Sequence, residues 1–470
     1  MLSWTHARKL SGHNTARAAA DSAQTRPHTS GLLDMTEPVT SNPDLGRVLR
    51  LRLTGFARRP VASDRFPTGR GHRPFTGILS EDGAVTPLEP FLIDVGDADL
   101  VDLRRRLSAA RWPSRETVSD WSQGLPLAVL RELCEHWQTA YDWRATERRL
   151  NRLPHYRTAI DGLSVHFIHL HSPVGHAVPL IMTHGWPGSF FEFEQVLERL
   201  ADPAAFGEAL RPAFQVVVPS LPGYGFSDAP TRPGWNIHRI AAAWAELMNR
   251  LGYSRFIALG SDWGTSISTS LALNHRQNLI GLHLIPPLVP PPAGGELTER
   301  EQASIKRLEA RNRTSSAYSQ IQATMPQTLG YSLVDSPVGL CAWILEKVWN
   351  WSDHEGELWE VLSPDQVLDN ITLYWLTRSG ASSARLYWES ISEVTAWFTR
   401  PGGEPITVPT GCTVFPQEVP RPYRRWAEPR FPAIVHWGEP ARGGHFGAWE
   451  QPELFISEVR AVAEALRSDG

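Results

Sequence analysis

The stretch Arg255-Phe256-Ile257-Ala258-Leu259-Gly260-Ser261-Asp262-Trp263-Gly264 joins an apolar segment to a pentapeptide with a small residue at each end. The apolar part predicts a buried strand, and glycines lie two residues on either side of Asp262. A chain that turns sharply from a strand into a helix needs such glycines, because a larger neighbour would clash. Ser261 fits the centre of the turn poorly, since its own flanks are Leu259 and Trp263. We therefore predict that this turn presents the Asp262 carboxylate.

A carboxylate at such a turn predicts nucleophilic attack on a saturated carbon. The attack forms an alkyl ester, which water must cleave in a later step. An epoxide or an alkyl halide is therefore the substrate class that this residue favours.

Composition excludes several classes of protein. With 470 residues, 41% of them apolar, the chain can bury a large core. Its 46 basic and 50 acidic side chains nearly balance, so no overall field favours nucleic acid or anionic lipid. The cysteines, Cys134, Cys341 and Cys412, are too few and too far apart for a disulfide framework or a zinc ribbon, and they indicate a reducing compartment. No apolar run approaches the ~20 residues of a membrane span, so we expect a soluble, cytoplasmic protein.

Residues 1–88 differ from the rest of the chain, being rich in Ala, Ser, Arg, Thr and Pro without sustained periodicity. We predict a disordered or non-native extension there. An alternative is a targeting or binding arm, because residues 47–73 hold eight arginines and one acid, Asp64. The remaining predicted parts are an N-terminal helical extension at 89–155, a core at 156–289 and 404–470, and a helical lid at 290–403.

Past Tyr156, short apolar runs alternate with helical patterns, which is typical of a parallel sheet with helices on both faces. The alternation stops where the helical, tryptophan-rich lid sequence begins and resumes after it. We therefore predict an α/β fold with a mostly parallel central sheet and an inserted lid. The predicted strands are 164–170, 178–183, 214–218, 256–259, 279–285, 406–415 and 433–437. The predicted helices include 100–110, 127–141, 240–251 and 452–466.

A nucleophile at this turn needs a base, which in this architecture is a histidine that follows the acid along the chain. His445, in Gly443-Gly444-His445-Phe446-Gly447, lies after the last predicted strand and before the last helix. Glu418 follows the preceding strand, where an acid would hold the imidazole in one tautomer. Glu428 and Glu439 lie on nearby loops and remain alternatives for the acid.

Cleavage of the ester creates an oxyanion on the carbonyl of the aspartate, which requires N–H donors already in place. The segment His184-Gly185-Trp186-Pro187-Gly188 follows a predicted buried strand, where such folds build an oxyanion hole. We predict that the backbone N–H groups of Trp186 and Trp263 form this hole. Loss of one such donor typically costs about a hundredfold or more in rate.

Opening of an epoxide leaves an alkoxide, which a tyrosine hydroxyl can hydrogen-bond or protonate. Tyr318 and Tyr387 in the predicted lid are candidates for this donor. The residues alone do not favour them over Tyr331 or Tyr374.

Several motifs in fixed order resemble the epoxide hydrolase family of the microsomal and juvenile-hormone type, which has an α/β-hydrolase fold with an N-terminal helical extension. The resemblance covers roughly residues 90–466. The motifs are Leu103-Arg104-Arg105-Arg106-Leu107 through Arg111-Trp112-Pro113, His184-Gly185-Trp186-Pro187-Gly188-Ser189, Pro222-Gly223-Tyr224-Gly225-Phe226-Ser227, residues 260–264, Asp335-Ser336-Pro337-Val338-Gly339-Leu340, Leu373-Tyr374-Trp375 and Gly443-Gly444-His445-Phe446.

This resemblance implies an epoxide hydrolase that uses no cofactor and no metal. It implies that Asp262 is the nucleophile, that His445 activates water and that Glu418 is the partner of His445. It also implies that Tyr318, before Ile-Gln, and Tyr387, in the Arg-x-Tyr pattern, are the proton donors of the lid. The chain departs from membrane-bound relatives at its start, where a polar, arginine-rich stretch replaces an apolar anchor.

The expected substrates are a small, apolar epoxide and water, without nucleic acid or a membrane span. A homodimer is compatible with the sequence. Lid tryptophans are expected to contribute to the substrate pocket, namely Trp343, Trp349, Trp351, Trp375 and Trp388.

Two other functions stay open at this point. A haloalkane dehalogenase shares an aspartate followed by a tryptophan, and Trp263 could donate to a halide. The helical extension, Trp186 and the paired lid tyrosines favour an epoxide instead. A catalytically silent lipid or hormone binder is disfavoured, because such proteins tend to lose the nucleophile or the histidine.

Overall fold

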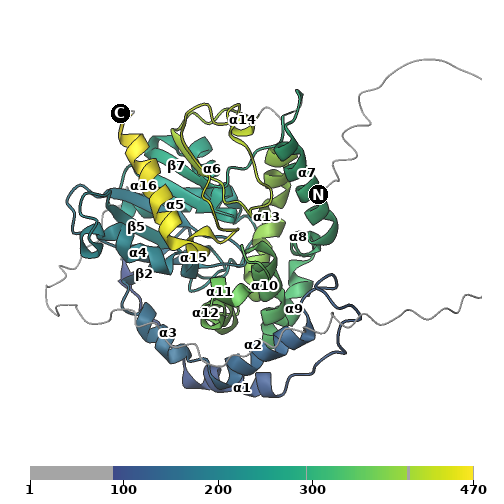
Figure 1. Ribbon diagram of the computed structural model, residues 1–470. Coiled ribbons are helices and arrows are strands. Elements are labelled where there is room, and N and C mark those ends of the chain that lie inside the picture. The colour runs from purple at the N-terminus through teal and green to yellow at the C-terminus, as the bar shows by residue number, and fades with distance from the viewer. Residues whose placement is uncertain (1–87, 293, 400–402, 469–470) are drawn as a thin grey trace, which may run out of the picture. The chain divides into compact units, whose positions relative to one another are not determined.

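A nine-stranded sheet forms the centre of the part of the chain that the structure, a computed structural model, describes, residues 88–292, 294–399 and 403–468 (Figure 1). The strand order is β1-β2-β3-β5-β4-β6-β7-β8-β9. Pairing is antiparallel from β1 to β5 and parallel from β5 through β4 to β9. The extension predicted at the start of the chain lies outside the described residues up to residue 87. The strands are β1 Glu89–Pro90, β2 His155–Ile160, β3 Leu163–Leu170, β4 Val178–Thr183, β5 Phe214–Pro219, β6 Phe256–Ser261, β7 Leu279–Ile285, β8 Thr410–Thr413 and β9 Ile434–Gly438.

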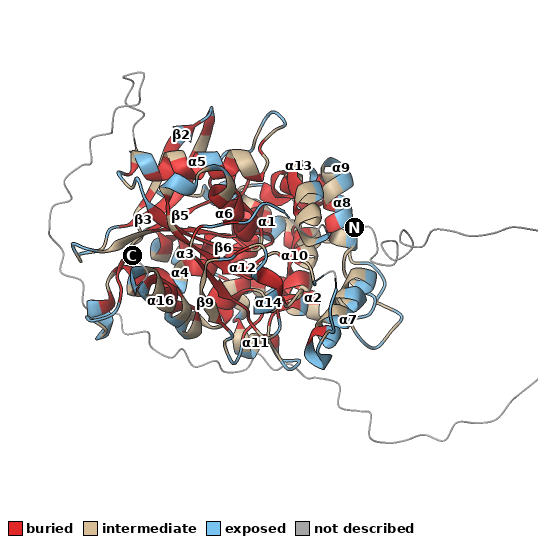
Figure 2. Ribbon diagram, turned by 90° about the horizontal axis from the view of Figure 1, so that it is seen from above, coloured by how far each residue is buried: buried red, intermediate tan, exposed pale blue. Residues whose placement is uncertain are grey.

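Strand β6 lies in the middle of the parallel part, between β4 and β7. All its residues are buried, because helices cover both faces of the sheet (Figures 1 and 2). Helix α4 (Glu194–Ala201) packs with α16 (Pro452–Ser468), and α5 (Ile237–Arg250) packs with α6 (Trp263–Asn274). A strand buried on both faces is a continuous apolar run, which explains why this strand could be predicted. Short helical segments in the loops are η2 Phe190–Phe193, η3 Pro203–Phe206, η4 Arg276–Asn278, α14 Arg424–Ala427 and α15 Gly447–Glu450.

The predicted fold class is confirmed, but the prediction missed β2 and its antiparallel pairing with β3. Asp161 and Gly162 join these strands with φ values of 51° and 76°. A two-residue hairpin turn of type I′ requires positive φ at both positions, and Asp-Gly is a strong signal for it. The predicted strand at 406–415 is shorter in the structure, because Pro409 and Pro416 flank β8 and have no N–H to donate to a neighbouring strand.

The helical lid is inserted between β7 and β8, which are adjacent parallel strands. It therefore leaves and re-enters the sheet at neighbouring positions and covers the edge at which the parallel strands end. Its helices are α7 Glu299–Thr314, α8 Ala317–Thr324, α9 Pro326–Asp335, α10 Pro337–Trp351, α11 Leu358–Val361, α12 Pro364–Leu376 and α13 Ser379–Thr399.

The N-terminal helices pack against the lid. They are α1 Asp97–Ser108, which ends two residues before the predicted boundary, α2 Leu127–Thr139 and α3 Trp143–Leu150. Trp137 of α2 donates its indole N–H to the Thr372 hydroxyl at 2.9 Å, and the Tyr141 hydroxyl donates to Asp369 at 2.7 Å. Thr372 and Asp369 both belong to α12, so this extension supports the lid from outside.

No helix among the described residues is by itself long and apolar enough to cross a membrane. Helices α9 and α10 reach that length and composition only together, and the chain bends by 115° between them. Leu340, Ile344 and Val348 of α10 belong to the hydrophobic core.

Candidate active site

The turn between β6 and α6 presents Asp262, whose backbone has φ 52° and ψ −121°. Residues other than glycine rarely adopt such a conformation, and it persists only where the surroundings enforce it. A Cβ on Gly260 would lie 2.0 Å from the Gly264 carbonyl oxygen, and a Cβ on Gly264 would lie 1.9 Å from the Thr183 carbonyl oxygen. Both glycines are therefore required for steric reasons.

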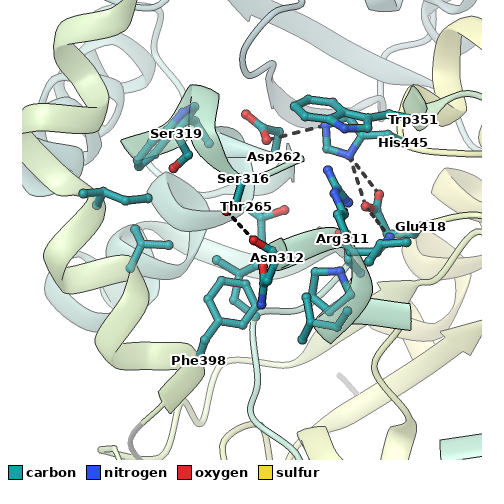
Figure 3. Close-up of a pocket in the computed structure, with 18 of the residues that line it drawn as sticks. Asp262, Thr265, Arg311, Asn312, Ser316, Ser319, Trp351, Phe398, Glu418 and His445 are labelled. Atoms are coloured by element: carbon teal, nitrogen blue, oxygen red, sulfur yellow. Dashed lines mark hydrogen bonds and ion pairs between the residues drawn. The ribbon is translucent and has the colours of Figure 1, made fainter. Parts of the chain in front are cut away.

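Asp262, His445 and Glu418 meet beyond the ends of parallel strands (Figure 3). His445 Nε2 lies 3.5 Å from Asp262 Oδ2, and His445 Nδ1 lies 3.1 Å from each carboxylate oxygen of Glu418. The alternative acids Glu428 and Glu439 are exposed, and neither bonds to His445 within the described residues. Glu418 is thus the carboxylate that holds the imidazole.

The two carboxylates control the charge of the histidine. Burial opposes protonation of the imidazole, but Glu418 and Asp262 outweigh that cost and raise the pKa of His445 to about 10. His445 is therefore protonated at neutral pH while Asp262 is a free carboxylate. Conversion of Asp262 into an ester would remove one of the two negative charges, so the pKa of His445 would fall at that stage.

A backbone N–H group holds one oxygen of the Asp262 carboxylate. The Trp186 N–H donates to Asp262 Oδ1 at 2.8 Å. Trp263 is the first residue of α6, and the first N–H groups of a helix have no partner within it. Oδ1 is therefore the oxygen that the backbone is prepared to stabilise, while Oδ2 faces His445.

Tyr318 of α8 and Tyr387 of α13 line the cavity in front of Asp262, with their ring centroids 6.0 Å apart. Burial raises the pKa of Tyr318 to about 12 and the pKa of Tyr387 well above its usual value. Both hydroxyls are therefore protonated at neutral pH and can donate. The other candidates lie elsewhere, since Tyr331 is 70% exposed and the Tyr374 hydroxyl donates to the Gly188 carbonyl.

Two protein families and several known proteins match this sequence. A family described as the epoxide hydrolase N terminus matches residues 88–193, and one described as the alpha/beta hydrolase fold matches residues 178–316. A candidate epoxide hydrolase of Stigmatella aurantiaca is 50% identical over 81% of this chain and 86% of its own length. Epoxide hydrolase 1 of Sus scrofa is 35% identical over 83% of this chain and 90% of its own length.

Two solved structures of epoxide hydrolases are similar to this chain. The juvenile hormone epoxide hydrolase of the silkworm Bombyx mori has a TM-score of 0.69 and 30% identity, and the match covers 82% of this chain and 95% of that one. An epoxide hydrolase of Aspergillus niger has a TM-score of 0.72 and 30% identity over 81% and 97% of the two chains. The chain belongs to the microsomal and juvenile-hormone epoxide hydrolase family. Its relatives also identify it as an enzyme, an epoxide hydrolase with the α/β-hydrolase fold.

The cavity of this epoxide hydrolase has a volume of about 160 Å³. Its walls differ in character: α13 contributes mainly apolar side chains, whereas the segment from α7 to α8 contributes mainly polar ones (Figure 3). The side chains concerned are Ile391, Val394 and Phe398 on the first wall, and Arg311, Asn312, Ser315, Ser316 and Ser319 on the second.

Trp351 lines this cavity, but the other four tryptophans predicted to do so do not. The prediction was wrong for these four, because the composition of a helical lid does not show which side of each helix faces inward. Trp343 donates to Gln322, Trp349 stacks on Trp121, Trp375 lies beside Arg106 and Trp388 is 53% exposed.

Glu450 supports the histidine and was missed by the sequence analysis. Its carboxylate accepts the N–H groups of Gly444 and Phe446, both at 2.9 Å, on either side of His445. It also accepts the Asp353 N–H from the lid at 2.6 Å. Nothing in the sequence distinguishes this glutamate from a surface acid, because its partners are backbone groups.

The lid also bonds directly to the histidine loop. The His445 N–H donates to the Trp351 carbonyl at 2.8 Å, and the Gly443 N–H donates to the Asp353 carboxylate at 2.7 Å. The Trp351 ring lies edge to face with the imidazole, with centroids 4.9 Å apart. The position of His445 in this family member therefore depends on the lid as well as on the core.

Proposed function

We propose that this protein hydrolyses a small, apolar epoxide to a vicinal diol through a covalent ester on Asp262. One observation carries the proposal. Asp262 lies between the Trp186 N–H and the His445 imidazole, at the end of a cavity that also contains two tyrosine hydroxyls.

In the first step, Asp262 Oδ2 attacks one epoxide carbon and the bond from that carbon to the epoxide oxygen breaks. Oδ1 already accepts the Trp186 N–H, so the attack is assigned to Oδ2, which lies 3.5 Å from His445 Nε2. The epoxide oxygen takes a proton from the pair Tyr318 and Tyr387, and a tyrosinate remains. Such a donor typically contributes about 10²–10⁴ in rate.

In the second step, the ester is hydrolysed. Protonated His445 returns a proton to the tyrosinate and becomes a free base, which the loss of the Asp262 charge favours. It then takes a proton from water as the water oxygen attacks the Asp262 carbonyl carbon. The Trp186 and Trp263 N–H groups stabilise the oxyanion. Collapse breaks the ester bond to the substrate oxygen, which takes the proton of the new aspartic acid, so that the diol leaves and the Asp262 carboxylate is restored. Glu418 holds the imidazole in position throughout.

Substitution His445→Gln tests this sequence of steps. The variant should form the ester and fail to cleave it, so the mass of the intact protein should rise by one molecule of styrene oxide. Peptide mapping should place the adduct on Asp262, and the double variant with Asp262→Ala should show none. Rapid diol formation by His445→Gln without an adduct would contradict the mechanism, and halide release from a bromoalkane by the wild type would favour a dehalogenase.

A further inference from the structure

Two lid cations lie close to Tyr318 and have no part in the steps above. Lys347 Nζ of α10 lies 4.5 Å from the centroid of the Tyr318 ring, and the Lys347 side chain is only 6% exposed. The chain has three lysines among 46 basic residues, so a lysine in this buried position is conspicuous. Burial of an ammonium group costs free energy unless a nearby charge or ring compensates it.

Arg311 of α7 is the second cation, and it lines the cavity (Figure 3). Its guanidinium carbon lies 4.8 Å from the centroid of the Trp351 ring, which lies 5.4 Å from the ring of Tyr318. The guanidinium donates to the Val419 carbonyl oxygen. Within the described residues no carboxylate forms an ion pair with Arg311, whereas Lys347 pairs with Glu346. Within the described residues, the Arg311 charge therefore lies in the cavity wall without a direct ion pair, although Asp262 and Glu418 line the same cavity.

The charges around Tyr318 act in both directions. Burial raises its pKa most, while the Arg311 charge and a hydrogen bond from Tyr387 lower it. The carboxylates of Asp262 and Glu346 raise it further. Asp262 loses its charge when the ester forms, which leaves Glu346, the partner of Lys347, as the carboxylate that opposes the Arg311 charge at Tyr318.

Tyr387 has different surroundings. Burial raises its pKa, and the charges of Tyr318 and Asp262 add to that rise. Its ring packs edge to face with Trp263, at 4.8 Å between centroids, and with Trp186, at 5.8 Å. No cation lies over the Tyr387 ring in the described part of the chain.

We propose that Tyr318 gives its proton to the epoxide oxygen and that Arg311 and Lys347 stabilise the tyrosinate that this leaves. Tyr387 keeps its proton and orients the epoxide oxygen by a hydrogen bond. As the carbon–oxygen bond of the epoxide breaks, the O–H bond of Tyr318 breaks and a new O–H bond forms on the substrate. This inference rests on the proposed function, because it assigns a role within the first step.

Single-turnover experiments with styrene oxide test the role of the cations. Ester formation on Asp262 is followed by rapid quenching and mass spectrometry. Arg311→Met and Lys347→Met should each slow ester formation about tenfold, because a cation that stabilises developing charge is lost. Arg311→Lys and Lys347→Arg should restore most of that rate. Arg313→Met and Lys306→Met, at exposed positions of α7, are the matched controls and should change it less than about twofold.

The two tyrosine backgrounds separate electrostatic stabilisation from a structural role. In Tyr318→Phe no tyrosinate forms at this position, so Arg311→Met should slow ester formation less than about twofold further. In Tyr387→Phe, Arg311→Met should still slow ester formation about tenfold. Tyr318→Phe should also lose more activity than Tyr387→Phe. Equal effects in both backgrounds, or a larger loss in Tyr387→Phe, would overturn the inference.

The Arg311 variants are interpreted separately from the Lys347 variants, because Lys347 is buried. Circular dichroism checks that each variant protein is folded. A wild type that forms neither ester nor diol would overturn the proposed function itself. If the wild type turns over but Arg311→Met slows ester formation equally in Tyr318→Phe and Tyr387→Phe, only the roles of Tyr318 and its cations would be overturned.

Discussion

The core half and the lid half of the site are built in different ways. Asp262, Glu418 and His445 lie on loops that follow β6, β8 and β9, so the order of the strands brings them together. Tyr318 and Tyr387 lie on helices α8 and α13, where only the rotation of each helix points them at the cavity. In the proposed mechanism, the core supplies the nucleophile and the base, and the lid supplies the proton donors for the epoxide oxygen. The second set can therefore change without altering the sheet.

The largest effect should come from removal of the proposed nucleophile. Asp262→Ala should reduce diol formation at least about 10⁴-fold, because no ester can form. The double variant Tyr318→Phe with Tyr387→Phe should still form some ester on a reactive epoxide, since strain in the ring assists its opening. Ester and diol are measured with styrene oxide. An Asp262→Ala protein more active than the double tyrosine variant would reverse the ranking of core over lid.

An intermediate effect is expected where the two halves meet. Glu450→Gln replaces one acceptor oxygen with an amide NH₂ that faces N–H donors, so the loop that holds His445 should shift. Ester hydrolysis should slow about tenfold, and ester formation should change less. Glu428→Gln, on an exposed loop, is the matched control. Equal slowing of both steps in single-turnover measurements would show general damage to the site instead.

The pH dependence of stability should also distinguish the two halves, because His445 in the core and Tyr318 in the lid titrate in different pH ranges. The pKa of His445 is raised to about 10 in the folded protein, against about 6.5 in an unfolded chain. The free energy that protonated His445 contributes to folding is therefore fully present below pH ~6.5 and is lost as the pH rises toward 10. Urea unfolding at several pH values should show the wild type losing stability relative to His445→Gln across this window. Tyr318→Phe should parallel the wild type there, because the pKa of Tyr318 is about 12.

The smallest effect is expected on the outer side of the lid. Trp388→Ala should change kcat/KM less than about twofold, because its side chain is 53% exposed and does not line the cavity. Trp351→Ala should cost more, since that ring contacts both Tyr318 and His445. Initial rates with styrene oxide compare the two. A large loss in Trp388→Ala with Trp351→Ala unaffected would restore the prediction made from composition.

The core half of the site could be predicted from the sequence, because strong local constraints there require particular residue types. Gly260 and Gly264 have no room for a Cβ, so the turn at Asp262 is visible in the sequence. His445 is found by its position between the last strand and the last helix, which the topology fixes. The strand β2, which the sequence prediction missed, also has a local signal, namely the Asp161-Gly162 turn that follows it.

The lid half lacks such signals. The lid tryptophans lie on different sides of their helices, so the sequence does not tell Trp351, which lines the cavity, from Trp388, which is exposed. The contacts of Glu450 are to backbone groups, which leave no trace in residue type. Arg311 lies in a polar helix whose inward side is set only by packing. The roles of the tyrosines came from family resemblance and stay predictions until the variants are measured.

The bonds between residues 351–353 and the loop around His445 constrain any attempt to build chimeras. Grafting a lid from another member of the family would also replace the Trp351 carbonyl and the Asp353 carboxylate that hold the loop around His445. A graft designed only around the helices that line the cavity would then have a displaced histidine and, by the proposed mechanism, would stop after ester formation. Junctions placed so that 351–353 stay with the recipient, or matched exchange of both segments, would let selectivity be engineered without that loss.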